Sequence, residues 1–213
     1  MKINTIRLRL ILGILGMALP WIVLILANIF DCIPGHIVPD SISATYYLAP
    51  CVTPFIIILG SAGILLISYQ GYDKQDDIVC SLAGIFALFI CLFPCSTDIL
   101  AIVGTFQLPV NVSSAIHNIS AVIFFALLSY NSFFLFTKSS GELTENKRKR
   151  NIIFRVCGVG MIGSFVLLIP VILFKIWGGT WLVETIALAF FGISWLTKCD
   201  IFPFLFCDTP YKD

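Results

Sequence analysis

The sequence predicts an all-α fold: a polytopic membrane bundle of six transmembrane helices, with the N-terminus and C-terminus both cytoplasmic. Composition is the first reason, because 59% of the 213 residues are hydrophobic and only 12% are charged, whereas soluble domains carry about 25% charged residues. A soluble fold of this size has too little room inside to hide so many apolar side chains. The apolar residues also form six long runs, and the basic residues gather in alternate connections between these runs.

The six runs have lengths close to the roughly 20 residues that a helix needs to cross a hydrocarbon core of about 30 Å. The first follows basic residues, as in a signal peptide, but its apolar stretch is too long and no small-x-small site follows, so we expect a retained helix. An apolar patch at 99–108 is half as long, and we expect it to form an interfacial or re-entrant segment. The predicted spans of this single domain, 1–213, are 10–30, 49–69, 78–94, 115–136, 152–174 and 181–196.

Lysine and arginine predict the orientation. With both ends of the chain in the cytoplasm, twelve of the thirteen basic residues lie inside and only Lys175 lies outside, as the positive-inside rule requires. The "KRKR" run at 147–150 matches a nuclear signal or a lipid-headgroup patch, but beside a membrane helix a topology anchor explains it better. The sequence therefore predicts a multi-pass protein of the cell membrane, in a bacterial inner membrane or plasma membrane.

This orientation gathers unusual polar residues on the outer side. The stretch "DSISATYY" at 40–47 lies there, between the first two spans. His117 and Glu184 lie within spans, where ionisable side chains are costly and usually face the bundle interior, and Asp98 lies at a matching height. We predict a polar pocket that opens outward. Its candidate catalytic or binding residues are His117, Glu184, Asp98 and Ser43, with Ser41, Tyr46 and Tyr47 at its lip.

Each candidate has a structural alternative. His117 and Glu184 could be interfacial groups that bond to each other or to water and hold the helices in register. Glu184 lies one residue too late for a capping box with Thr180 as the cap. The tyrosines could anchor the chain at the interface, and the two serines could serve a turn or a helix cap. The residues alone leave these alternatives open.

The candidate residues are compatible with two kinds of chemistry. A serine nucleophile needs a base and an orienting acid; Ser41 or Ser43, His117, and Asp98 or Glu184 supply these types, although no GxSxG elbow is present. A metal site could combine His117 with Asp98 and Glu184, but one histidine within the membrane is weak support. The cofactor stays unknown, and the sequence does not decide whether the protein is an enzyme.

Two further patterns carry less. "GVGMIG" at 158–163 matches the dinucleotide-binding pattern but lies inside an apolar helix, so we interpret its glycines, like the pairs Gly13 and Gly16 and Gly60 and Gly63, as helix-packing positions. Three cysteines fall near the outer face, and at most one disulfide can join two of them. They are Cys32, Cys51 and Cys95.

Several stretches in order, "SISATYY", "SYQGYD", "LAGIFAL" with "LFP", "AVIFFALLSYNSFFLFTK", "KRKRN" and "WLVETIALAFFGISWLTK", resemble a widespread bacterial family of small integral membrane proteins without an assigned function. The resemblance runs from about Ser41 to Lys198; it implies six spans and no reaction. The chain is more remotely similar to the membrane hydrolase superfamily of alkaline ceramidases and adiponectin receptors. The pattern of that superfamily has seven spans and a three-histidine zinc site. This sequence departs from it, with six predicted spans and with Glu184 and Trp195 in place of histidines in the last span.

Three classes of function follow. The first is a pocket protein for an unidentified ligand, the second is a membrane-embedded hydrolase acting on a lipid or amide, and the third is a small transporter or sensor, or a structural assembly partner. The absence of internal repeats and of charge at mid-membrane argues against an ion-coupled carrier. A net charge of +1 gives no case for nucleic-acid binding. The expected partners are membrane lipids and a small-molecule ligand, and no oligomeric state is predicted.

Overall fold

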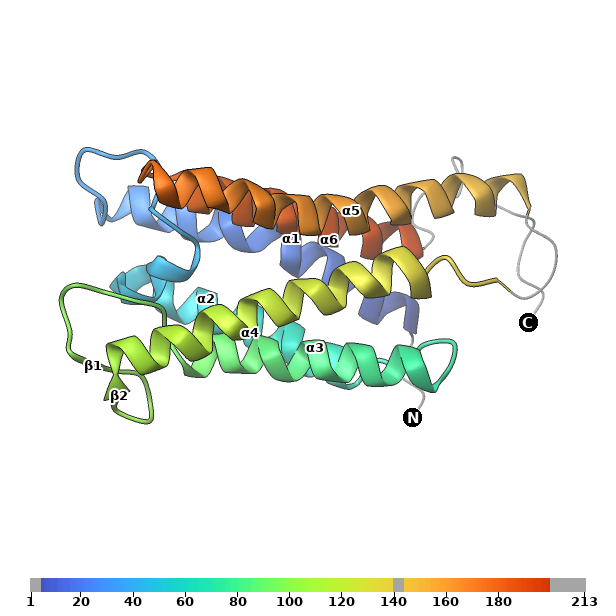
Figure 1. Cartoon of the computed structure of the whole chain (residues 1–213), viewed down its shortest axis with the longest axis horizontal. Helices are drawn as coiled ribbons and strands as arrows, with labels where there is room; N and C mark the ends of the chain where they lie inside the picture. The colour runs from blue at the N-terminus through green and yellow to red at the C-terminus, as the bar shows by residue number, and fades with distance from the viewer. Residues whose placement is uncertain (1–4, 140–143, 200–213) are drawn as a thin grey trace.

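Six long helices run up and down in one bundle in the computed structural model of the chain, which describes residues 5–139 and 144–199 (Figure 1). All six are long and apolar enough to cross a membrane, by length and composition, so the predicted all-α bundle of a multi-pass membrane protein is confirmed. The helices are α1 (Thr5–Ile29), α2 (Ala49–Ile67), α3 (Lys74–Leu92), α4 (Val110–Tyr130), α5 (Glu145–Leu173) and α6 (Gly179–Lys198).

Four short elements complete the fold. A 3₁₀-helix, η1 (Ser43–Tyr47), lies between α1 and α2, and a π-helical turn, η2 (Asn131–Leu135), continues α4. Strands β1 (Ile102–Val103) and β2 (Leu108–Pro109) pair as an antiparallel hairpin between α3 and α4. We call the end of the bundle that carries η1 and the hairpin the η1 end. The opposite end, where α3 and α5 begin, is the Asp73 end.

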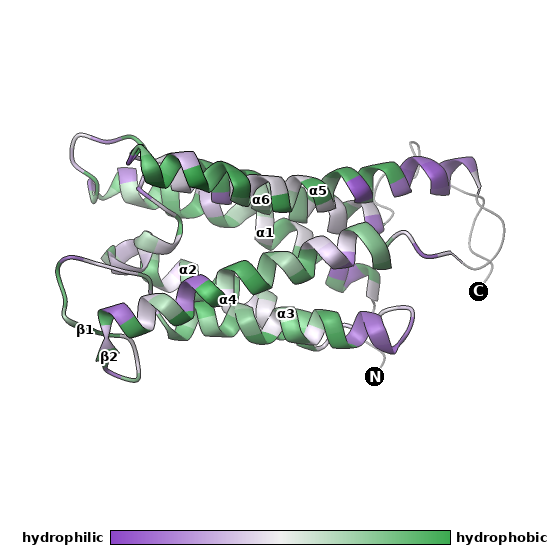
Figure 2. Ribbon diagram, in the orientation of Figure 1, coloured by the Kyte–Doolittle hydropathy of each residue, from purple (hydrophilic) through white to green (hydrophobic). Residues whose placement is uncertain are grey.

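The helices form two groups in Figure 1, with α1, α5 and α6 on one side and α2, α3 and α4 on the other. Contacts between α1 and α2 and between α4 and α5 join the two groups. Figure 2 shows hydrophobic residues along the middle of the helices and hydrophilic residues at the start of α3 and of α5. This distribution is the one expected when lipid surrounds the middle of a bundle and water surrounds its ends.

Glycines allow several helix pairs to approach closely. A Cβ atom on Gly84 of α3 would lie 2.4 Å from the carbonyl oxygen of Gly63 on α2, and one on Gly16 of α1 would lie 2.4 Å from the ring of Phe191 on α6. The packing interpretation is therefore confirmed for Gly63 and Gly16. Small residues at such crossings are typical of membrane bundles, because they let the helix backbones come together.

The "GVGMIG" glycines differ from one another in the structure. Gly160 packs against α6, since a Cβ atom there would lie 2.4 Å from the ring of Phe190, and the described element that precedes its helix is η2 and not a strand. For Gly163 the packing prediction is wrong. A Cβ atom at Gly163 would find nothing within 4 Å, because that side of α5 faces open space.

The connection from α3 to α4 contains no re-entrant helix, whereas the alternative of an interfacial segment stays a prediction. The patch at 99–108 forms a β-hairpin at the η1 end, with positive φ angles of 73° at Gly104 and 50° at Gln107 in its turn, and no re-entrant helix (Figure 1). The fourth span begins at Val110, five residues before the predicted position, since α4 follows directly after β2. The fifth begins at Glu145, seven residues early, because Thr144 caps a polar turn that extends α5 beyond its apolar run.

Polar contacts at the Asp73 end fix the turn between α2 and α3. Asp73 caps α3, with its carboxylate accepting hydrogen bonds from the backbone N–H groups of Gln75 and Asp76. Lys138, beyond η2, donates to Asp73 Oδ2 at 2.8 Å. This bond holds the pKa of the Asp73 carboxyl below its usual value and raises the pKa of Lys138. The pair ties the start of α3 to the end of the fourth span.

Candidate functional site

The connection from α1 to η1 lies along the start of α6, and this contact brings the candidate site together. Three alternate residues of this connection, at 38, 40 and 42, form hydrogen bonds through their backbone groups. Their partners follow one another at intervals of about one helical turn, just before and within the first turns of α6. The bonds run from Trp177 Nε1 to the Val38 carbonyl at 3.0 Å, from Trp181 N to the Asp40 carbonyl at 3.0 Å, and from Ile42 N to Glu184 Oε2 at 2.5 Å. Glu184 is therefore the third point that fixes this segment, which we call the 38–42 segment.

Ser43, the first residue of η1, lies between His117 and Glu184. Its Oγ is 3.0 Å from His117 Nε2 and 3.4 Å from Glu184 Oε1. The other ring nitrogen of the histidine, Nδ1, is 2.8 Å from the carbonyl oxygen of Phe93 at the end of α3. These contacts bring α3, α4, η1 and α6 together around Ser43.

The positions of the hydrogens on His117 and Ser43 follow from the carbonyl group of Phe93. A carbonyl oxygen only accepts, so His117 Nδ1 carries a hydrogen and donates it to Phe93. In a neutral imidazole Nε2 then accepts, and the hydroxyl of Ser43 donates to it. Because a hydroxyl has one hydrogen, Glu184 Oε1 retains the capacity to accept a hydrogen bond from another donor.

The side chains of His117, Ser43 and Glu184 differ in how far they are buried. His117 is only 3% exposed and does not line the adjacent cavity, so it lies behind Ser43. Ser43 and Glu184 are partly exposed, and both line the cavity. Within the residues that the structure describes, no lysine or arginine forms an ion pair with Glu184. In this arrangement its carboxylate accepts a hydrogen bond from a neutral donor, the backbone N–H of Ile42.

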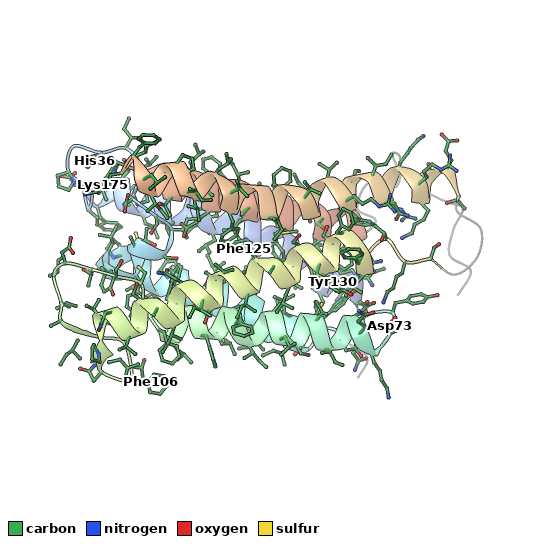
Figure 3. All side chains as sticks on the ribbon, viewed as in Figure 1. His36, Asp73, Phe106, Phe125, Tyr130 and Lys175 are labelled. Atoms are coloured by element: carbon green, nitrogen blue, oxygen red, sulfur yellow. The ribbon has the colours of Figure 1, made fainter. Side chains whose placement is uncertain are left out.

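The cavity has a volume of about 40 Å³ and lies between the two helix groups. Apart from Ser43 and Glu184, its wall is apolar, and Figure 3 shows one of its residues, Phe125 of α4, in the space between α4 and α5. The apolar part of the wall comes from five helices and the residue before η1. It comprises Leu19, Ile42, Phe55, Leu59, Ile90, Ala121, Phe124, Phe125 and Leu188.

Asp98 and the predicted metal set do not join this cluster. Asp98 is exposed in the connection that follows α3, and it makes no contact with His117 or Glu184 among those recorded for the described residues. Residues 5–139 and 144–199 contain no group of three or more His, Cys, Asp or Glu side chains placed to hold a metal ion. The predicted grouping of Asp98 with His117 and Glu184 is therefore not seen among the described contacts.

The residues predicted at the lip lie beside the cavity and are not part of its wall. Ser41 Oγ accepts a hydrogen bond from Ala44 N at 2.8 Å, which is a turn-capping role. Tyr47 donates its hydroxyl to the Cys95 carbonyl at 2.6 Å, and burial raises the pKa of this tyrosine to about 12. Tyr46 packs edge to face on Tyr47 and on Phe55. These contacts fix η1 against α2 and the end of α3.

Sequence reasoning missed two backbone groups and the apolar wall. Phe93 supplies a carbonyl and Ile42 supplies an N–H, and backbone groups leave no trace in residue type. One signal was available, because the last carbonyls of a helix lack partners within it and "FP" at Phe93 and Pro94 marks the end of α3.

The three cysteines of the η1 end, Cys32, Cys51 and Cys95, are free thiols.

Comparisons with known proteins add no relative: no family model, no curated protein and no solved structure matches the chain. The resemblance to the bacterial membrane family therefore stays a prediction.

Proposed function

We propose that the chain binds a small, membrane-soluble molecule in the cavity beside Glu184. The observation that supports this proposal most directly is the composition of the cavity wall, which is apolar except for one carboxylate and one hydroxyl. Small-molecule sites typically combine an apolar wall with a few polar groups that fix orientation. Here the polar groups are themselves positioned, since Ile42 and His117 hold Glu184 and Ser43 in place.

A substitution that fills the cavity tests this proposal. Ala121→Phe places a ring in the cavity wall, while Ala126→Phe adds the same ring on an exposed position of the same helix. We expect native mass spectrometry of protein transferred from its membrane into nanodiscs to show a bound small molecule with the wild type and with Ala126→Phe. The molecule should be lost with Ala121→Phe. Equal retention by both variants, or no bound molecule in any of them, would count against the proposal.

We also propose that the η1 end faces the outside and that the Asp73 end faces the cytoplasm, in a cell membrane. The distribution of basic residues supports this orientation. Lys175 lies at the η1 end, opposite Asp73 (Figure 3), whereas the other lysines and arginines of the described residues belong to the segments that meet at the other end. Cytoplasmic connections carry such an excess of lysine and arginine.

Cysteine labelling checks this orientation. In a variant without the native cysteines, single cysteines are introduced at three exposed positions: Ser96→Cys and Gln107→Cys at the η1 end, and Gln70→Cys at the Asp73 end. A membrane-impermeant maleimide added to intact cells should label the first two and should label the third only after the cells are opened. Labelling of the cysteine at position 70 in intact cells, with protection of the other two, would reverse the orientation.

A hydrolase is the second candidate function, and the Ser43–His117 contact favours it. At 3.0 Å, His117 Nε2 can take the proton of the Ser43 hydroxyl as that oxygen attacks a carbonyl carbon. The arrangement differs from a serine triad, since Nδ1 faces a backbone carbonyl and Glu184 lies beside the serine. A carboxylate in that place opposes the negative charge that develops during acyl transfer. For this reason we rank binding first.

Labelling with an alkyl fluorophosphonate separates the two functions. If Ser43 is an activated nucleophile, peptide mass spectrometry should find the probe on Ser43, and His117→Ala should lower the labelling rate by about 100-fold or more. Ser41→Ala is the control, because Ser41 bonds to Ala44 and not to the histidine. An unlabelled Ser43 in a folded bundle would contradict the hydrolase function, and binding would be the one remaining candidate of the two.

A further inference from the structure

We infer that the cavity selects a single-chain amphiphile whose head group is a primary ammonium, with the ammonium at Glu184 and an unbranched alkyl chain between the helices. This inference rests on the proposed function and names its ligand class.

The charge of Glu184 is the first argument. Its Oε2 accepts from the backbone of Ile42, and its Oε1 is 3.4 Å from Ser43 Oγ, whose hydrogen points to His117. Carboxylates within membrane spans are normally paired with a positive charge, and the described residues provide no such partner for Glu184. An ammonium group carries a positive charge and three N–H donors. It would supply both the missing charge and a donor for Oε1.

The potential around the cavity favours the same sign of charge. Cys95 lies outside the spans, just after α3, and the pKa of its thiol depends on the charges around it. The pKa of its thiol is raised to about 12, mainly by burial and further by the negative charges of Glu184 and Asp40. Two acids therefore act on this region. The carboxylate of Glu184 in the cavity wall would repel a carboxylate or phosphate head group.

The shape of the cavity restricts the apolar part of the ligand. A volume of about 40 Å³ is only a few times the roughly 10–15 Å³ that one water molecule needs. Phe55, Phe124 and Phe125 form part of the wall, and all three side chains are buried. A fused ring system or a pair of acyl chains does not fit this space, whereas the first few methylene groups of one unbranched chain do, with the rest of the chain in the surrounding lipid.

The head group decides the selectivity. Lipid tails are as apolar as the cavity wall, so moving an alkyl chain from the membrane into the cavity gains little. The bond between the head group and Glu184 is available only in the cavity. Ligands with the same chain and different heads should therefore bind with clearly different strengths.

Three ligands with one chain length test the inference on the full-length protein in phosphatidylcholine nanodiscs. Dodecylamine, dodecanol and dodecanoate are added at equal membrane content, and the midpoint of thermal unfolding is recorded, because a ligand stabilises the state that binds it. For the wild type we expect dodecylamine to raise the midpoint most and to half-saturate at a concentration about tenfold lower than dodecanol. Dodecanoate should have the smallest effect. This order is measured on the wild type and needs no variant.

Matched variants assign the effect to one carboxylate. Glu184→Gln removes the charge while its amide oxygen can still accept from Ile42, and Asp98→Asn removes the same charge from an exposed position at the same end. Glu184→Gln should lose the preference for dodecylamine over dodecanol, whereas Asp98→Asn should keep it. Ala121→Phe should lose the response to both ligands.

The outcomes separate the ligand class from the proposed function. Equal effects of dodecylamine and dodecanol on the wild type, both lost in Ala121→Phe, would overturn the ammonium inference and keep the binding site. Equal loss of the amine effect in Glu184→Gln and Asp98→Asn would overturn it as well, since surface charge would explain the result. Responses that are the same in wild type and Ala121→Phe would overturn the proposed function itself.

Discussion

Gly84→Ala is expected to lower the free energy of unfolding of the bundle by about 1–3 kcal/mol or more, which is the range for an overpacked core position. The added methyl group would lie 2.4 Å from the Gly63 carbonyl oxygen and 3.0 Å from the Ile67 backbone nitrogen. Both are backbone atoms and cannot rotate away, so α2 and α3 must separate. The midpoint of thermal unfolding in detergent, together with size-exclusion chromatography, measures the effect.

Gly60→Ala is the matched control on the facing helix. It adds the same methyl group, but the nearest atom, Cys91 Sγ, lies 4.0 Å from the new position. Alanine is more favourable than glycine inside a helix by about 0.5–1 kcal/mol, so this variant should be neutral or slightly more stable. Similar losses of stability in both variants would show that the Gly84 contact does not set the distance between the helices.

A double-mutant cycle on His117→Ala and Glu184→Gln is expected to show a coupling of about 0.5 kcal/mol or more in the free energy of unfolding, as is found for residues that share a hydrogen-bond network. The two side chains meet through Ser43, which is 3.0 Å from one and 3.4 Å from the other. Removing either partner therefore changes what the hydroxyl of Ser43 can bond to. Thermal unfolding of the wild type, both single variants and the double variant supplies the four values.

The same cycle in a Ser43→Ala background shows how the coupling is transmitted. Without the hydroxyl, the two changes should add within about 0.3 kcal/mol, because no described contact joins the histidine to the carboxylate directly. Coupling that persists without the hydroxyl would mean that the residues communicate by another route. Additivity in the parent protein would mean that His117 and Glu184 are independent groups.

Hydropathy predicted the number of helices but not where all of them begin. A span prediction from hydropathy detects only the apolar part of a helix. Helix α5 begins seven polar residues before its apolar run, because Thr144 caps the helix there. The hairpin between α3 and α4 was missed for a different reason. Its strands have only two residues each, which is too short for an alternating pattern to appear.

The candidate site was predictable in part. His117, Ser43 and Glu184 could be grouped because each is a polar residue near the same end of a span. Asp98 was grouped with them for the same reason, yet it lies on the exposed connection after α3, and a sequence gives height along a bundle more readily than direction around it. The cavity wall could not be predicted, since Phe55, Ala121 and Leu188 look like any other apolar residues of a membrane helix.

The three bonds between the 38–42 segment and the start of α6 join residues made early in synthesis to residues made late. When the first two helices have been inserted, the carbonyls of Val38 and Asp40 and the N–H of Ile42 still lack the partners that Trp177, Trp181 and Glu184 provide. The part of the wall that carries Ser43 therefore gains these bonds only when α6 has been made. The proposed binding site is thus complete only once α6 lies beside the 38–42 segment.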